Sequence, residues 1–129
     1  MTGTNDVAAN SKAVEALKQA VCDRVDELAD QLIDASHQIH AHPELNFEEH
    51  FAHDLLTAML DRHDVAAVRH AYGLETAFDS TAGSDGPTVA VLCEYDALPG
   101  VGHACGHNII ATAGSVSYTH LTLPTIYSV

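Results

Sequence analysis

The sequence predicts an α/β domain in which two helices are followed by the β-strands of a mixed sheet. Three observations lead to this prediction: a long amphipathic stripe near the start, a second helical stripe after Pro43, and an uncharged, β-branched run at residues 88–93. A run of that kind is typical of a strand buried on both faces of a sheet. Polar residues and glycines follow it at once, and the sites of α/β sheets lie beyond the carboxyl ends of their strands.

The two helices are predicted from the spacing of apolar residues. In the first, the apolar positions recur every three or four residues from position 12, at Val14, Leu17, Val21, Val25, Leu28, Leu32, Ala35 and Ile39. Pro43 cannot continue a helix, so we expect the first helix to end near His40 and its stripe to face a core. Asn46 and Glu49 have capping-box spacing, which predicts a second helix that continues to about Asp61.

Residues 12–114 are expected to form one domain fragment. Before them, residues 1–11 are small and polar without a period, and we expect a loose leader there. Short β-prone runs are expected within 65–78 and a turn at 80–86, because of the glycine and polar residues in that turn segment. Residues 109–113 are predicted to form the first turns of a further helix.

The last fifteen residues, 115–129, differ from the rest in composition. They contain no Asp, Glu, Lys or Arg, although 18% of the chain is charged. Their sequence resembles the translation of a synthetic adaptor used in sequencing libraries, so we expect a tail that is not native. The alternative is a genuine strand rich in Thr and Tyr, which would make His120 and Tyr127 candidate site residues.

Charge and composition argue against two classes of binding partner, nucleic acids and membranes. Eighteen acidic against five basic residues give a formal charge of -13, which repels a phosphate backbone or an anionic membrane surface. No apolar run near the start or later in the chain has the length of a signal peptide core or a membrane span. We therefore expect a cytoplasmic protein without nucleic-acid or membrane partners. The three cysteines, an odd number at unrelated spacings, are expected to be reduced thiols.

Five side chains that could bind a metal or transfer a proton lie within fifteen positions after the predicted strand: Glu94, Asp96, His103, Cys105 and His107. In an extended stretch Cys105 and His107 project to the same side, so that a thiolate and an imidazole can meet one ion at about 2.3 and 2.0 Å. Gly106 between them would let the backbone bend close to that ion. A structural cysteine beside a surface histidine is the commoner explanation of such a pair taken alone.

The neighbouring residues add a family resemblance. Residues 94–99 (Glu-Tyr-Asp-Ala-Leu-Pro) and 102–108 (Gly-His-Ala-Cys-Gly-His-Asn) resemble the signature of the amidohydrolase branch of metallopeptidase family M-twenty. Residues 40–49, with His, then Pro-Glu-Leu, then a helix, resemble its N-terminal motif. The branch includes aminoacylase-1-like dipeptidases, hippurate hydrolases and p-aminobenzoyl-glutamate hydrolase. Asn108 and the preceding Gly-Val-Gly-His favour the subgroup near p-aminobenzoyl-glutamate hydrolase and the β-alanyl-lysine-type dipeptidases.

The resemblance implies the N-terminal part of a zinc-peptidase-like catalytic domain. Cys105 and His107 would bind metal, zinc most often and manganese or cobalt otherwise, with two ions in the full-length enzyme. Asp96 would be a catalytic-site residue that orients a ligand imidazole from the outer shell. Glu94 falls where other branches place a metal histidine. His103 is interpreted as a hydrogen-bonding loop histidine.

The implied reaction is hydrolysis of a small-molecule amide or dipeptide by a metal-activated water, in an enzyme expected to be a homodimer when full length. The general base and the remaining ligands lie beyond Gly114 in relatives, so we expect this chain alone to be inactive. Two other functions remain open: a non-catalytic metal-binding module, and a thiol redox protein that uses Cys105. The redox function would require a depressed thiol pKa, and no Lys or Arg lies near Cys105 in sequence.

Overall fold

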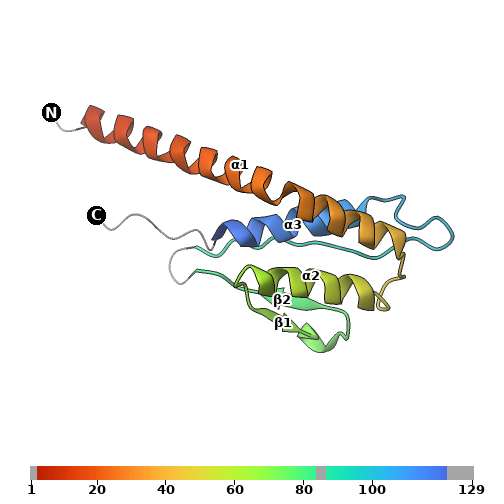
Figure 1. Ribbon diagram of the computed structural model, residues 1–129. Helices are drawn as coiled ribbons and strands as arrows, with labels where there is room; N and C mark the ends of the chain where they lie inside the picture. Colours follow the sequence, from red (N-terminus) through yellow and green to blue (C-terminus); the bar gives the residue numbers. More distant parts are fainter. Residues whose placement is uncertain (1–2, 84–86, 122–129) are drawn as a thin grey trace. The chain divides into compact units, whose positions relative to one another are not determined.

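The computed structural model describes residues 3–83 and 87–121 of the chain. Its elements, in order, are α1 (Gly3–Ala41), α2 (His50–Arg62), β1 (Ala67–Arg69), the short helix η1 (Ala71–Gly73), β2 (Phe78–Ser80) and α3 (His107–Leu121), as Figure 1 shows. The chain divides into two compact units, residues 1–30 and 31–129. Parts of the predicted turn (84–86) and of the predicted tail (122–129) lie outside the described residues.

The first unit is the N-terminal stretch of α1. The helix begins at Gly3, so residues 3–11 are helical where the sequence predicts a loose leader. This segment contains no proline, and Ala8 and Ala9 have the highest helix propensity of any residue type. Ion pairs between residues one helical turn apart stabilise this helix on its exposed surface. Lys18 Nζ lies 2.8 Å from Glu15, and Arg24 lies 2.9 Å from Glu27.

The second unit has its core where the end of α1, α2 and α3 meet. The core residues are buried and apolar: Ala35, Ile39, Ala52, Leu56, Met59 and Ala111. α1 ends at Ala41, one residue beyond the predicted His40, because Pro43 follows. α2 also ends within one residue of the prediction. The apolar spacing therefore predicts the end of α1 and the face that it buries in this unit. For α2 it predicts the helix and its end, but the helix begins at His50 rather than after Asn46 and buries Ala52, Leu56, Met59 and Leu60.

A two-stranded antiparallel sheet packs beside α2. β1 pairs with β2 in the register Ala67 to Ser80 and Arg69 to Phe78. Arg69 also joins the sheet to α2, since its guanidinium donates to Asp61 Oδ2 at 2.6 Å and to Thr57 Oγ1 at 3.1 Å. The described residues thus form part of an α/β domain, and the sheet among them is antiparallel rather than mixed.

The predicted strand at residues 88–93 does not form a β-ladder with any described residue. Val89 and Leu92 are 82% and 90% exposed, although the sequence predicts burial on both faces. At the end of the segment, Cys93 packs against α3 so closely that a Cβ added to Gly114 would lie 1.9 Å from its Sγ. The prediction of a paired, doubly buried strand is wrong for this structure because pairing needs neighbouring strands, which the described residues do not supply.

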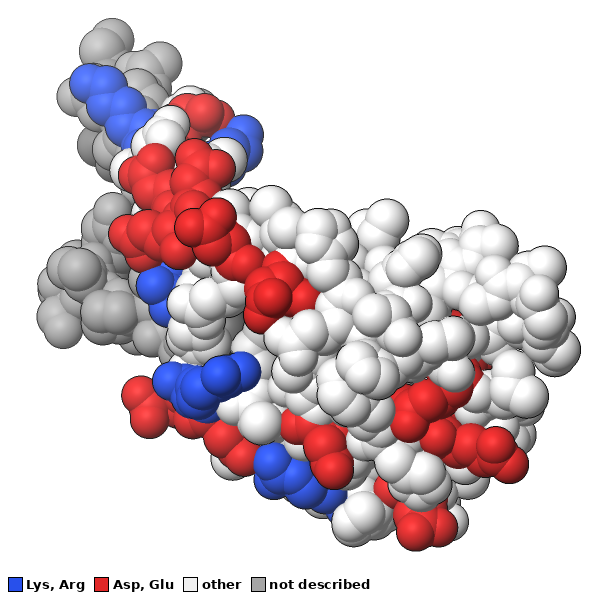
Figure 2. Space-filling model, turned by 45° about the vertical axis from the view of Figure 1, so that its right-hand side comes forward, with Lys and Arg blue, Asp and Glu red and all other residues white. Residues whose placement is uncertain are grey.

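The acidic excess of the sequence is visible on the surface. On the face that Figure 2 shows, Asp and Glu side chains outnumber those of Lys and Arg. Among the described residues, no helix is both long and apolar enough to cross a membrane.

Candidate functional site

The predicted site lies in the loop that leads into α3, and the Pro-Glu-Leu motif holds that loop. The Ala97 N–H donates to the Glu44 carbonyl at 2.7 Å, and Leu45 forms an isolated parallel bridge with Ala97. The Leu98 N–H then donates to the Gly102 carbonyl at 2.9 Å, which closes a tight turn. Gly102 has φ 62°, in the left-handed region that glycine adopts without strain. The two sequence motifs of the family resemblance are therefore in direct contact.

Glu44 has a second role that the sequence did not reveal. Its carboxylate accepts hydrogen bonds from the Phe51 N–H at 2.8 Å and from the Ala52 N–H at 3.0 Å. These are N–H groups of the first turn of α2, which have no partner within the helix. The predicted capping box of Asn46 and Glu49 forms no side-chain cap hydrogen bond. Glu44 thus caps α2 with its side chain while its backbone holds the loop.

Asp96 and His107 form the best-defined contact of the site. His107 Nδ1 lies 2.8 Å from Asp96 Oδ1 and 3.0 Å from the Asp96 carbonyl oxygen. Both oxygens are acceptors, so Nδ1 carries a proton, and the neutral form of the ring has its lone pair on Nε2. An imidazole fixed in this way by a carboxylate is the usual arrangement of a metal-binding histidine. The geometry suits the role predicted for Asp96.

Cys105 lies on the exposed surface, in a turn rather than in the extended stretch that the sequence suggests. The Gly106 N–H donates to the His103 carbonyl at 3.0 Å, and Gly106 has φ 79°. The backbone therefore turns over residues 103–106, and Cys105 and His107 do not lie in one extended stretch. Within residues 3–83 and 87–121, no three His, Cys, Asp or Glu side chains are grouped closely enough to hold a metal ion. The thiol and imidazole suit a borderline-soft divalent ion as two members of a shell.

His103 is buried, at 5% exposed. Neither ring nitrogen has a hydrogen bond of good geometry among the described residues, although the Ile39 backbone lies close enough to act on the ring as a partner. Its ring lies 6.1 Å from that of His40, measured between centroids. Burial lowers the pKa of His103, and the nearby His40 and His107 lower it further. These contacts therefore favour the neutral ring over the charged one.

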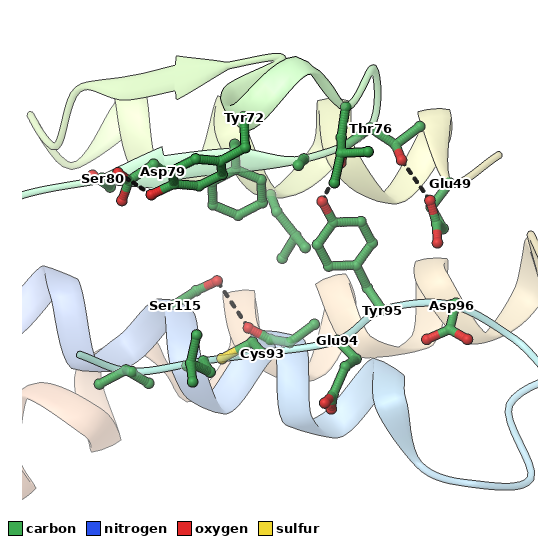
Figure 3. Close-up of a pocket in the computed structure, with 18 of the residues that line it drawn as sticks. Glu49, Tyr72, Thr76, Asp79, Ser80, Cys93, Glu94, Tyr95, Asp96 and Ser115 are labelled. Carbon is green, nitrogen blue, oxygen red and sulfur yellow. Dashed lines mark hydrogen bonds between the residues drawn. The ribbon is translucent and has the colours of Figure 1, made fainter. Parts of the chain in front are cut away.

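A groove borders the site at Asp96. Its volume is about 380 Å³, and it lies between β2 and residues 91–96 (Figure 3). Asp96 lies toward one end of the groove, whereas Glu94 lies nearer its middle and its carboxylate points away from β2. Side chains of α2 and α3 line the groove as well. Glu94 is exposed there.

Three residues that the sequence analysis did not assign to the site connect the two sides of this groove. Tyr95 points across it, and its hydroxyl donates to the Thr76 carbonyl (Figure 3). The Thr76 hydroxyl donates to Glu49 Oε2 at 2.6 Å. Burial is the main cause that raises the pKa of Tyr95 to about 12, and the negative charge of Glu49 is the second. The phenol therefore keeps the proton that it donates. Because these contacts join residues 19 and 27 positions apart, local sequence patterns give no signal for them.

Comparison with known proteins gives relatives of one enzyme type, although no protein-family model matches the chain. The Xaa-Arg dipeptidase of Mus musculus is 46% identical over 111 residues, which cover 78% of this chain and 26% of that protein. The Xaa-Arg dipeptidase of Homo sapiens is 43% identical over 117 residues, or 81% and 27% of the two lengths. One of the subunits of the p-aminobenzoyl-glutamate hydrolase of Escherichia coli is 32% identical over 118 residues, or 78% and 22%. The chain spans about a quarter of the length of these curated relatives.

Proposed function

Because the chain belongs to the amidohydrolase branch of metallopeptidase family M-twenty, we propose that it supplies the first metal ligands of a metal-dependent amidohydrolase. The relatives are hydrolases of the dipeptidase and amidohydrolase type. The proposed reaction is cleavage of the amide bond of a dipeptide, an N-acyl amino acid or a p-aminobenzoyl-glutamate-like compound. The observation that carries the proposal is the Asp96 carboxylate on His107 Nδ1.

The residues of the chain have separate tasks in this proposal. His107 Nε2 and the Cys105 thiolate bind the metal, and Asp96 keeps the His107 ring in one tautomer and one orientation. Gly106, with its positive φ, ends the turn that carries Cys105 and leads into α3. Glu44 holds the start of the loop through the Ala97 N–H. A site built in this way is ordered before the metal arrives.

A divalent ion, zinc in the first place and manganese or cobalt otherwise, supplies Lewis acidity when bound and lowers the pKa of a water molecule toward about 7. Cys105 and His107 form only part of a shell, so we propose that further ligands and the general base come from the remaining length seen in the relatives. The full-length enzyme is proposed to hold two ions, to be a homodimer and to be cytoplasmic.

The test is hydrolysis with and without metal. The full-length protein, expressed from a genomic frame that continues past Gly114, is stripped with a chelator and assayed on Xaa-Arg dipeptides, N-acetyl amino acids and p-aminobenzoyl-glutamate. We expect hydrolysis of at least one class to disappear on chelation and to return with Zn²⁺, Mn²⁺ or Co²⁺. The chain of 129 residues should hydrolyse none of them. Hydrolysis that survives complete metal removal would contradict the proposal.

A further inference from the structure

Two buried polar side chains flank the proposed ligands along the chain. His103 lies two positions before Cys105, and Asn108 directly follows His107. Each of the two flanking residues is 5% exposed. Burying a polar side chain is unfavourable unless it finds a partner, so the contacts of these two residues show what holds the ligand segment.

Asn108 finds its partner on α1. Its Nδ2 donates to Ser36 Oγ at 2.9 Å and to the Ser36 carbonyl oxygen at 3.3 Å. Because a carbonyl oxygen can only accept, the nitrogen of the Asn108 amide and not its oxygen must face Ser36. The two residues are 72 positions apart, and their contact joins the first turn of α3 to the C-terminal part of α1.

His103 packs against the same end of α1. Its ring lies 6.1 Å from that of His40 between centroids, and the Ile39 backbone lies close enough to act on it as a partner. The loop also passes close to Pro43, because a Cβ added to Gly102 would lie 3.8 Å from the Pro43 Cβ. The end of α1 and the proline beyond it therefore form the surface on which the loop lies.

Both proposed ligands lie between these two anchors, in backbone that is itself hydrogen-bonded. The Gly106 N–H donates to the His103 carbonyl at 3.0 Å, and the Ile110 N–H donates to the Gly106 carbonyl at 3.1 Å. Tight metal binding needs ligands held within about 0.5 Å of their productive positions. An anchor on each side, with a turn and a helix start between, restricts the ligands in this way.

We infer that Asn108 is a positioning residue of the metal site, which docks on Ser36 and thereby fixes the first turn of α3 and the direction in which His107 presents Nε2. His103 holds the other end of the same stretch, so the end of α1 sets how the two ligands lie. The inference rests on the proposed function for the identity of the ligands, whereas the docking itself requires no metal.

Zinc affinity of the full-length protein, measured by competition with a chromophoric chelator, tests the inference. Asn108→Leu keeps the approximate shape of the side chain and removes its hydrogen bonds, and the affinity should fall about tenfold or more. Asn108→Asp should recover part of the loss, because the Ser36 hydroxyl can donate to a carboxylate. Combined with Ser36→Ala, Asn108→Asp should bind zinc no better than Asn108→Leu does.

Thr112→Val is the matched control. Thr112 is also 5% exposed and belongs to the same helix, but its hydroxyl donates to carbonyls of α3, those of Asn108 at 3.0 Å and Ile109 at 3.1 Å. Zinc affinity of this variant should stay near that of the parent. An equal loss in Thr112→Val and Asn108→Leu would mean that any change inside α3 disturbs the site, which would overturn the inference.

A second measurement separates the inference from the proposed function, because it uses the metal-free chain of 129 residues. Hydrogen–deuterium exchange of the Gly106 and Ile110 amides should become about tenfold faster in Asn108→Leu and stay unchanged in Thr112→Val. Amides of α2 are the internal control. If the full-length parent protein binds no zinc, the proposed function fails, and this measurement still decides whether Asn108 holds the turn.

Three further results would overturn the inference. The first is unchanged zinc affinity in a folded Asn108→Leu protein. The second is an advantage of Asn108→Asp that persists with Ser36→Ala, since this would show an effect of charge rather than docking. The third is unchanged exchange of Gly106 and Ile110. If circular dichroism shows that Asn108→Leu does not fold, Ser36→Ala alone decides, with an expected loss of about threefold in zinc affinity because the carbonyl acceptor remains.

Discussion

At the scale of single residues, Asp96 contacts His107 through two atoms, its carboxylate and its backbone carbonyl. The backbone contact fixes where the imidazole lies, because it depends on the path of the loop. The carboxylate contact adds negative charge, which makes the free Nε2 a better metal ligand. A substitution that keeps the shape of Asp96 and removes its charge separates these two contributions.

We predict that Asp96→Asn in the full-length protein weakens zinc binding by about 10- to 100-fold, the usual cost of losing such a partner. The amide oxygen still accepts the His107 N–H, so the fold should be unchanged by circular dichroism. Zinc affinity is measured by competition with a chromophoric chelator. Asp79→Asn is the matched control, since Asp79 accepts a hydrogen bond from Tyr72 and does not contact His107. Equal loss in both variants would argue against a specific role for Asp96.

At the scale of elements, the N-terminus of α2 depends on a residue outside the helix. Two N–H groups of its first turn donate to the half-buried Glu44 carboxylate. A carboxylate at this end also interacts favourably with the helix dipole. The same residue holds the site loop through its carbonyl, so helix and loop share one anchor.

Glu44→Ala is therefore predicted to destabilise the fold by about 1 kcal/mol, within the range for loss of a helix N-cap. Urea unfolding of the chain, followed by circular dichroism, measures this. Glu48→Ala removes an exposed carboxylate four residues further on and should have a much smaller effect. If both variants unfold at the same urea concentration as the parent chain, the two hydrogen bonds of Glu44 contribute nothing to stability.

Sequence patterns predicted the elements whose determinants are local. The spacing of Ala35 and Ile39 and the position of Pro43 fix the end of α1 within a few residues of chain. The Asp96–His107 contact was also predictable, but from family resemblance rather than from spacing. Its two members are eleven positions apart, with a loop between them.

The features that sequence analysis missed depend on residues far apart in the chain. Glu49 meets Thr76 across 27 positions, and no periodicity marks such a pair. His103 is 5% exposed, and its ring lies near that of His40, which is far away in the chain. Residues 88–93 have the composition of a buried strand, but burial of a strand depends on partners that composition does not supply.

At the scale of the whole molecule, the chain places two potential metal ligands, Cys105 and His107, where the loop meets α3. Asp96 orients the His107 ring. The described residues do not complete a metal shell. A partial shell binds metal weakly, because affinity depends on the number and arrangement of ligands. Strong binding should therefore appear only in the full-length protein, and it should depend on these two side chains.

Metal content of the full-length protein tests this central claim most directly. Elemental analysis is applied to the parent protein, to Cys105→Ser, to His107→Ala and to Cys93→Ser, each after equal dialysis and with the fold checked by circular dichroism. We predict that Cys105→Ser and His107→Ala lose most of the bound metal. Cys93→Ser should keep it, because that thiol packs against α3 at Gly114. Full metal content in the Cys105 and His107 variants, or equal loss in Cys93→Ser with the fold intact, would contradict the assignment of the ligands.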